Sequence, residues 1–233
     1  MNEARPRGFD WHGRRHGKKL RPGLQALVDT LLPKLRIDDG RQINAIFQAN
    51  TKDVWLEIGF GGGEHLAEQA ARNPDIGFIG CEPYINGVAR LLSFVDRDGL
   101  ENVRIVDDDA RPLLDQLPDA SLGRAYLLFA DPWPKARHNK RRFMNPENLD
   151  RLSRVMKDGA ELVFASDHPG HVEWALEVAL KHPDFHWTAR QPNDWRIPPV
   201  DWVQTRYEKK ALSNGIKSSY LLFERQPRTA INP

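Results

Sequence analysis

The sequence predicts an α/β fold in which helices cover both faces of a doubly wound, mostly parallel sheet. From residue 50 onward, short apolar runs alternate with amphipathic helical patterns, which is the order that βαβ units produce. Two runs, AYLLFA at residues 125–130 and AELVFAS at residues 160–166, are apolar almost throughout, as strands buried on both faces are. The length of 233 residues suits one large domain of this class.

Seven apolar runs are predicted as strands, at residues 54–60, 77–82, 103–107, 125–130, 160–166, 185–190 and 219–224. Helices are predicted between them at residues 64–73, 85–95, 146–155 and 171–181. Asn145 and Asp167 precede the last two helices and are candidate N-caps. Proline-rich chain separates the last two strands, so an antiparallel strand can form at that edge of the sheet.

The first 50 residues contain no strand pattern. Residues 24–35 form one short amphipathic segment, which Pro33 interrupts. Residues 1–23 carry seven lysines and arginines against two acids, a net charge of +5. We therefore expect residues 1–40 to form a basic N-terminal arm that is free to be flexible, and residues 41–233 to form the domain.

A second basic block, KARHNKRR, occupies residues 135–142 and also carries a net charge of +5. Because the whole chain has a net charge of only +2, the remaining residues carry a net charge of −8. Separate clusters of cations predict a polyanionic partner, since lysines and arginines bind phosphates and release counterions. For the N-terminal block alone, a solvated basic tail is an equally good interpretation.

Composition excludes several classes of protein and of site. No apolar stretch reaches the roughly 20 residues of a membrane helix, and the basic N-terminus is unlike a secretory signal. Cys81 is the only cysteine, which excludes a disulfide framework and favours the reducing cytoplasm. The pairs His12/His16 and His182/His186 have four-residue spacing but no third ligand, so no metal is predicted.

Carboxylates stand at or near the carboxyl ends of five predicted strands, and these are Glu57, Glu82, Asp109, Asp131 and Asp167. In an open α/β sheet, ligands bind at this edge. Several carboxylates gathered there require a ligand with positive charge or several donors. Taken alone, Asp167 could equally be a helix N-cap.

The turn after the first strand reads EIGFGGGE over residues 57–64. A dinucleotide fingerprint would place glycine or alanine at position 64, where this chain has Glu64. Carboxylates at Glu57 and Glu64 would repel a pyrophosphate. The turn instead fits S-adenosylmethionine, a cofactor without phosphate that carries a sulfonium, an ammonium and a ribose diol.

The pattern E-x-G-x-G-x-G, followed by an acid after the second strand, resembles that of class I methyltransferases. More specifically, FADPWPKARHNKRRF at residues 129–143 and TRYEKK at residues 205–210 are similar to the bacterial tRNA (guanine-N7)-methyltransferase family. The resemblance spans residues 41–224. It implies a Rossmann-like fold with a seven-stranded, mostly parallel sheet, and methyl transfer from S-adenosylmethionine to N7 of a tRNA guanosine, position 46 in the variable loop.

The resemblance also implies roles for individual residues. Cofactor contacts are expected from Glu57, Gly59, Gly61, Gly63, Glu82, Asp109, Ala110 and Asp131. Substrate contacts are expected from Lys135, Asp167, Thr205, Arg206, Tyr207 and Glu208. RNA-backbone contacts are expected from Arg137, His138, Asn139, Lys140, Arg141 and Arg142. Asp131 is the expected catalytic residue, because a carboxylate can stabilise the positive charge that develops on the guanine ring.

Two other functions stay open on the residues alone. Exocyclic-amine methyltransferases use an Asp/Asn-Pro-Pro-aromatic loop after the fourth strand, whereas this chain reads Asp131-Pro132-Trp133-Pro134. Pro134 stands where some members of the resembling family carry histidine. A non-catalytic RNA-binding protein that retains the cofactor fold is the second alternative. The sequence predicts tRNA as the partner and leaves monomer and homodimer open.

Overall fold

The structure is a computed structural model, and it describes residues 15–228. One seven-stranded sheet has the order β3-β2-β1-β4-β5-β7-β6. The strands are β1 (Asp53–Ile58), β2 (Ile76–Cys81), β3 (Val103–Val106), β4 (Leu122–Leu128), β5 (Met156–Ser166), β6 (Phe185–Trp187) and β7 (Ser219–Arg225). A strand is present at each of the seven predicted runs, although β6 covers only the first three residues of the run predicted at 185–190 and is only partly buried.

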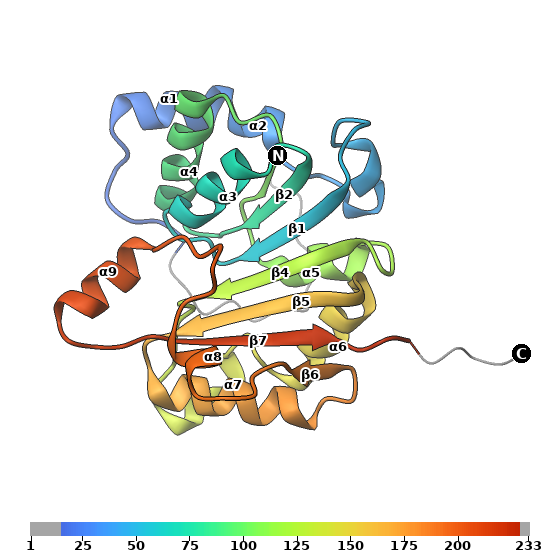
Figure 1. The fold of residues 1–233 in the computed structure, drawn as a ribbon. Helices are drawn as coiled ribbons and strands as arrows, with labels where there is room; N and C mark the ends of the chain where they lie inside the picture. The colour runs from blue at the N-terminus through green and yellow to red at the C-terminus, as the bar shows by residue number, and fades with distance from the viewer. Residues whose placement is uncertain (1–14, 229–233) are drawn as a thin grey trace, which may run out of the picture.

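The pairs from β3 to β5 are parallel, whereas β7 runs antiparallel between β5 and β6. In Figure 1 the arrows of β1, β4 and β5 point one way and the arrow of β7 points the other way. The predicted antiparallel strand is confirmed at this edge, where β7 pairs with β5 on one side and with β6 on the other. The predicted fold class, with its mostly parallel sheet, is therefore confirmed.

Helices α3 (Glu64–Arg72), α4 (Ile85–Asp98), α6 (Pro146–Val155) and α7 (Pro169–Lys181) match the four predicted helices. The structure adds α5 (Ala110–Gln116), α8 (Asn193–Arg196), α9 (Arg206–Ser213) and the 3₁₀ helices η1 (Gly40–Ala45) and η2 (Ala136–Arg141). The added helices span at most eight residues, too few for a hydrophobic period to be visible in the sequence. As predicted, the Asn145 side chain caps α6 by accepting from the backbone N–H of Asn148 at 3.0 Å.

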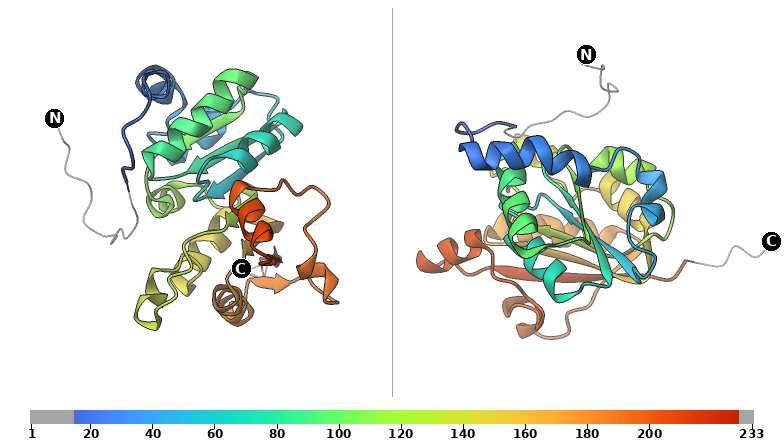
Figure 2. Two further views of the ribbon diagram at one scale, coloured as in Figure 1. Left: turned by 90° about the vertical axis from the view of Figure 1, so that its left-hand side faces the viewer. Right: turned by 90° about the horizontal axis from the view of Figure 1, so that it is seen from above.

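The sheet lies between helices (Figure 2), and buried apolar side chains pack as a layer between the helices and each face of the sheet. On one face, Leu56 and Ile58 of β1 share a core with residues of α5, α6 and α7. On the other face, Phe78 of β2 shares a core with α3 and α4. Alternate strand residues point to opposite faces, which is why neighbouring positions enter different layers.

The N-terminal segment packs against the second of these layers. Helices α1 (Pro22–Thr30) and α2 (Leu32–Leu35) lie beside α4 and β3, and Leu32 and Leu35 are buried in the same cluster as Leu91. The expected boundary at residue 40 therefore does not coincide with a break in packing, because the apolar side of residues 24–35 covers α4. Residues 1–14 of the expected arm, with Arg5, Arg7 and Arg14, lie outside the described residues.

Candidate active site

The turn between β1 and α3 forms an open cradle at the carboxyl ends of the parallel strands. Gly59, Gly61 and Gly63 have φ values of +70°, +56° and +76°, which favour glycine. A Cβ on Gly59 would meet no heavy atom within 4 Å, so the space in front of it is open. The backbone here can be approached closely by a ligand.

Glu82 follows β2 and holds this turn in place. Its Oε2 accepts from the backbone N–H of Gly61 at 2.8 Å, and its Oε1 accepts from that of Tyr84 at 2.9 Å. Burial raises the pKa of Glu82 above its usual range, the two backbone donors oppose this rise, and the charges of Asp131 and Glu57 add to it. Two other predicted carboxylates, Glu57 and Asp131, therefore lie close enough to Glu82 for their charges to act on it.

Glu57, at the end of β1, is buried and pairs with a residue that was not among the predicted site residues. Its Oε2 lies 2.7 Å from Nδ1 of His65, in the first turn of α3, and His65 is only 2% exposed. The signal that was available in the sequence is the pair His65 and Gln69, two polar residues four apart that interrupt the apolar side of α3.

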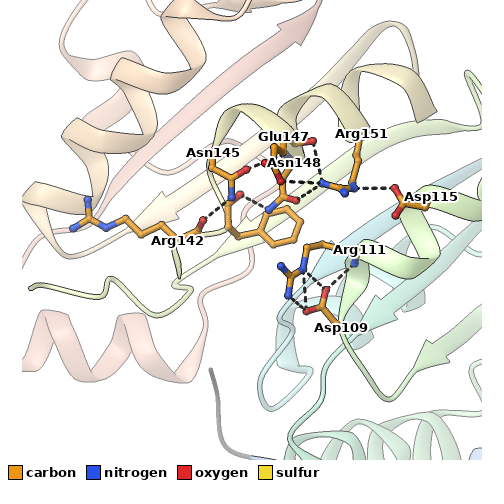
Figure 3. Close-up of polar contacts among 9 residues, drawn as sticks. Asp109, Arg111, Asp115, Arg142, Asn145, Glu147, Asn148 and Arg151 are labelled. Atoms are coloured by element: carbon orange, nitrogen blue, oxygen red, sulfur yellow. Dashed lines mark hydrogen bonds and ion pairs between the residues drawn. The ribbon is translucent and has the colours of Figure 1, made fainter. Parts of the chain in front are cut away.

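Asp109 caps helix α5 and is engaged by a neighbouring cation. Its Oδ1 accepts from the backbone N–H of Arg111 at 2.8 Å, and the Arg111 guanidinium contacts Oδ2 at 2.6 Å (Figure 3). Any contact between Asp109 and the adenine of a cofactor would share this carboxylate with Arg111. The predicted neighbour Ala110 is buried as the first residue of α5.

The loop after β4 presents the predicted catalytic Asp131, which is exposed. On either side of it, Phe129 and Trp133 have φ values of +51° and +45°. This left-handed conformation is unfavourable for large side chains by on the order of 1 kcal/mol each, and it concentrates at functional sites. Surrounding contacts must therefore hold the loop in shape.

Arg142 supplies these contacts, and this corrects its predicted role in binding the RNA backbone. It is only 5% exposed, and its guanidinium donates to the carbonyl oxygens of Pro132 at 2.8 Å, Gly170 at 3.3 Å and Trp133 at 3.4 Å. The same group lies 5.3 Å from the centre of the Trp174 ring. In Figure 3 the guanidinium points away from the N-terminus of α6. Three of its five N–H donors are directed at these carbonyl oxygens and the side chain is buried, so Arg142 supports the loop and does not extend into solvent toward a phosphate.

The rest of the basic run consists of Lys135 and the 3₁₀ helix η2, and its side chains are either exposed or half-buried. Lys135, Arg137 and Lys140 are exposed. Arg141 and His138 are half-buried against the Trp133 ring, at 4.9 Å for the guanidinium carbon and 5.8 Å between ring centres. Asn139 is also half-buried. The first group can reach a polyanion, while Arg141 and His138 pack on the loop that carries Asp131.

Helix α9 begins at the predicted substrate segment. The Thr205 side chain caps it by accepting from the backbone N–H of Glu208 at 3.1 Å. Glu208 is 2% exposed and accepts from Nε1 of Trp202 at 2.8 Å and from the hydroxyl of Tyr220. Both Glu208 oxygens thus already have protein donors, and burial together with this contact raises the pKa of Tyr220. Glu208 also lines a pocket of about 440 Å³ between α9 and the chain that precedes it.

Tyr207 and Arg206, in contrast, are exposed. Tyr207 is 64% exposed, and its Cε2 lies 3.6 Å from the place that a Cβ on Gly61 would occupy. An aromatic ring from α9 therefore lies over the glycine turn of β1. Asp167 is half-buried after β5 and is not a cap, because the N-cap of α7 is His168.

Comparisons with known proteins agree with this geometry. A family described as putative methyltransferases matches residues 51–221. A relative from Rhodospirillum rubrum, named tRNA (guanine-N(7)-)-methyltransferase, is 48% identical over 94% of this chain and 89% of its own length. Relatives of the same name from Chelativorans and Agrobacterium fabrum are each 46% identical, over 91% and 96% of this chain and 94% and 99% of their own lengths. The chain belongs to the tRNA (guanine-N7)-methyltransferase family.

Solved structures place this member of the tRNA (guanine-N7)-methyltransferase family among Rossmann-like methyltransferases. The 16S rRNA methyltransferase KamB matches with a TM-score of 0.55 at 16% identity, over 80% of this chain and 93% of that one. The antibiotic-resistance methyltransferase Kmr matches with a TM-score of 0.51 at 18% identity, over the same shares. At these identities the likeness is one of fold, and it confirms the predicted class I architecture.

Other predicted features of this family member can be placed as well. Cys81 is fully buried in β2, and burial raises the pKa of its thiol, as suits a small core residue. Within residues 15–228, no group of three or more histidine, cysteine or acidic side chains could hold a metal ion. In the same part of the chain, no helix combines the length and apolarity needed to cross a membrane.

His171 provides a test of the packing behind the Asp131 loop. Burial against Phe164, aided by the charges of Arg142 and His168, lowers the pKa of His171 from 6.5 to about 4. The unfolded chain takes up this proton below pH 6.5, whereas the folded protein resists it until about pH 4. Above pH 6.5 the histidine is neutral in both states and does not lower the free energy of unfolding. As the pH drops from 6.5 to about 4, only the unfolded chain takes up the proton, so the free energy of unfolding falls.

We expect His171 to account for on the order of 3 kcal/mol of that fall. Urea unfolding at several pH values between 7 and 4 measures it, with His171→Leu as the comparison because leucine cannot take up a proton. The variant should lose less stability than the wild type between pH 6.5 and 4. Parallel pH profiles for the two proteins would contradict the assignment.

Proposed function

We propose that this protein transfers a methyl group from S-adenosylmethionine to N7 of a guanosine in tRNA, at position 46 of the variable loop. The observation that carries the proposal is the placement of Asp131, in a loop held by Arg142, close enough to the cradle for its charge to act on Glu82. The family named above supports the same reaction. Since its substrate is tRNA, we place the activity in the cytoplasm, as the single cysteine predicts.

The described residues fit S-adenosylmethionine. The glycine turn is open at Gly59, and Glu57, Glu82 and Asp131 give the cradle the negative charge that a cation requires. Glu82 keeps a second lone pair on each oxygen for ribose hydroxyls while it holds Gly61 and Tyr84. When bound, S-adenosylmethionine supplies an electrophilic methyl group on a sulfonium centre. Glu57 and Asp131 would hold its cationic part, and Asp109 and Ala110 would hold the adenine.

The residues around the cradle can orient a guanine, and attack by its N7 needs no general base. N7 of guanine carries a lone pair at neutral pH, so no proton has to leave before attack. Asp131 stabilises the positive charge that develops on the imidazole ring, which favours the transition state over the ground state. Tyr207 lies over the glycine turn with an exposed ring on which an unstacked base can rest. Alignment of N7 with the bond between the methyl group and sulfur contributes further to the rate.

Two groups of exposed cations flank this edge and form the proposed tRNA surface. One group is Lys135, Arg137 and Lys140 in and before η2. The other is Lys18 and Lys19, in a segment fastened to the start of α4. There the Gly17 N–H donates to Asn86 at 2.9 Å, and Asn86 donates to the carbonyl of Lys18 at 2.7 Å. The N-terminal segment thus brings its positive charge to the residues just after Glu82.

We expect Arg137→Gln combined with Lys140→Gln to weaken tRNA binding and to flatten its dependence on salt. Each lost phosphate contact lowers the slope of log affinity against log salt by about 0.7–0.9. The measurement is tRNA affinity at four salt concentrations. Lys52→Gln combined with Lys181→Gln is the matched control, because both residues are exposed and lie outside the proposed tRNA surface. If the salt dependence of tRNA binding is unchanged in the Arg137→Gln/Lys140→Gln variant, the RNA surface lies elsewhere on the protein.

The reaction is tested by incubating the purified protein with an unmodified tRNA transcript and labelled S-adenosylmethionine. Digestion to nucleosides and mass spectrometry should give 7-methylguanosine. A transcript in which 7-deazaguanosine replaces guanosine should accept no label, because its ring has carbon in place of N7. An N2- or N6-methylated product would instead support an exocyclic-amine methyltransferase. Binding of tRNA without any transfer would support the non-catalytic alternative.

A further inference from the structure

The side chain of His65 is buried between the glycine turn and the segment that leads into α9. Its Nδ1 lies 2.7 Å from Oε2 of Glu57, and the two side chains are 2% and 5% exposed. A carboxylate only accepts, so Nδ1 carries the proton of this hydrogen bond. Nε2 is buried and has no hydrogen-bond partner among the residues that the structure describes. The hydrogen bond to Glu57 therefore engages Nδ1 alone, and Nε2 takes no part in it.

Two aromatic rings fix the orientation of His65. Tyr126 of β4 meets it edge to face, with 4.8 Å between ring centres, and Trp202 lies 5.6 Å away on the segment before α9. Trp202 is itself held by Glu208. Gln69, one turn further along α3, donates to the carbonyl of Asp201 at 2.9 Å and ties the same two segments together. The imidazole therefore cannot rotate away from Glu57 without displacing packed side chains.

This arrangement has a consequence for the cradle. Glu57 lies at the ligand edge, close enough for its charge to act on Glu82. Because His65 holds Oε2, the orientation of the carboxylate is fixed, and no hydrogen bond from the described residues occupies Oε1, which can accept from a cationic ligand. A free glutamate would have to lose side-chain rotamers on binding, which costs affinity.

We propose that His65 is a positioning residue of the methyl-donor site, which acts by orienting Glu57 toward the cationic part of S-adenosylmethionine. The proposal rests on the proposed function, because it takes S-adenosylmethionine as the ligand. It assigns a role in binding to a buried histidine whose ring would otherwise only fill space beside Tyr126 and Trp202.

Two substitutions of His65 distinguish a residue that orients Glu57 from a residue that only fills space. His65→Asn places an amide donor near the position of Nδ1, so the hydrogen bond to Glu57 can be kept. His65→Gln places its amide nearer the position of Nε2, so that bond is lost although the side chain is larger and equally polar. A residue that only fills space would be replaced better by glutamine, whereas an orienting residue would be replaced better by asparagine.

The experiment is calorimetric titration of S-adenosylmethionine into full-length wild type, both variants, Glu57→Gln and the double variant Glu57→Gln/His65→Gln. We expect His65→Gln to weaken affinity about 10- to 100-fold, as the loss of a hydrogen bond to a charged group does, and His65→Asn to weaken it by less than about threefold. In the Glu57→Gln background, His65→Gln should add little, because the two residues act as a unit. In methyl-transfer assays, His65→Gln should raise the KM for S-adenosylmethionine and leave kcat near the wild-type value.

Thermal unfolding of each variant reports whether the fold is kept. If asparagine and glutamine weaken binding equally, or if the effects of the two sites add, the proposal is overturned. Affinity that depends on His65 as expected, in a protein that forms no 7-methylguanosine, would keep the proposal and reject the RNA reaction. A wild-type protein that does not bind S-adenosylmethionine would overturn both.

Discussion

Replacing Asp131 by asparagine should remove nearly all methyl transfer while leaving the fold intact. The carboxylate follows β4 at the ligand edge and is exposed, and it lies close enough to Glu82 for its charge to help raise the pKa of Glu82, so we expect it to meet both the methyl donor and the guanine ring. Loss of a group that stabilises transition-state charge typically lowers turnover by about 10²–10³-fold. Asparagine keeps the size of the side chain and removes its charge, so the change isolates electrostatics.

Single-turnover transfer to an unmodified transcript measures this effect, with saturating tRNA and S-adenosylmethionine. Glu173→Gln on α7 is the matched control, since it also removes one exposed carboxylate. Thermal unfolding should be nearly unchanged in both variants, because exposed substitutions usually alter stability by less than about 0.5 kcal/mol. Turnover of Asp131→Asn close to that of the wild type would exclude a catalytic role.

The second large effect is expected at Arg142, and it is an effect on stability. Arg142→Leu would remove the donors to three carbonyl oxygens, those of Pro132, Trp133 and Gly170, and the contact with Trp174. The free energy of unfolding should fall by about 3 kcal/mol, as expected for the loss of buried hydrogen bonds to a charged group. Turnover should fall as well, because the unfavourable backbone of the Asp131 loop depends on these bonds.

Arg137→Leu is the matched control for this change, since it alters the same residue type five positions earlier on an exposed site. It should leave urea unfolding within about 0.5 kcal/mol of the wild type and lower the salt dependence of tRNA binding. Arg142→Leu should do the reverse, with reduced stability and a salt slope like that of the wild type. If Arg142→Leu has normal stability and its tRNA binding depends less on salt, then Arg142 contacts the RNA backbone, as its place in the basic run predicts.

The strands and the acidic edge could be predicted for one physical reason. A strand buried on both faces must be apolar along its length, so β4 and β5 are visible in the sequence, and an acid that follows such a strand stands at the ligand edge. Asp131 and Glu82 were found in this way. The helices α5 and α9 could not be found, because they are short and their caps, Asp109 and Thr205, are residues that also occur in loops.

The family motifs predict which residues belong to the site, but they do not distinguish exposed residues, which can contact a ligand, from buried residues, which hold the site in shape. Glu208 and Tyr207 are adjacent in the sequence. Yet Glu208 is buried against Trp202 and Tyr220, while Tyr207 lies exposed over the glycine turn. Helical geometry separates adjacent residues by about 100°, and only the packing of α9 fixes which of them turns inward.

By itself, the sequence determined the strands and their order along the chain, because these depend on local apolar patterns. Its motifs determined the family, and the positions of Glu57, Glu82 and Asp131 near strand ends predicted the acidic edge. Tertiary structure alone decided that Arg142 supports the loop while Arg137 faces solvent, and that His65 meets Glu57. Residues of one type within one run are chemically identical until neighbouring segments bury some of them. What differs is which buried carbonyl or carboxylate each donor reaches, and that is set by contacts between distant parts of the chain.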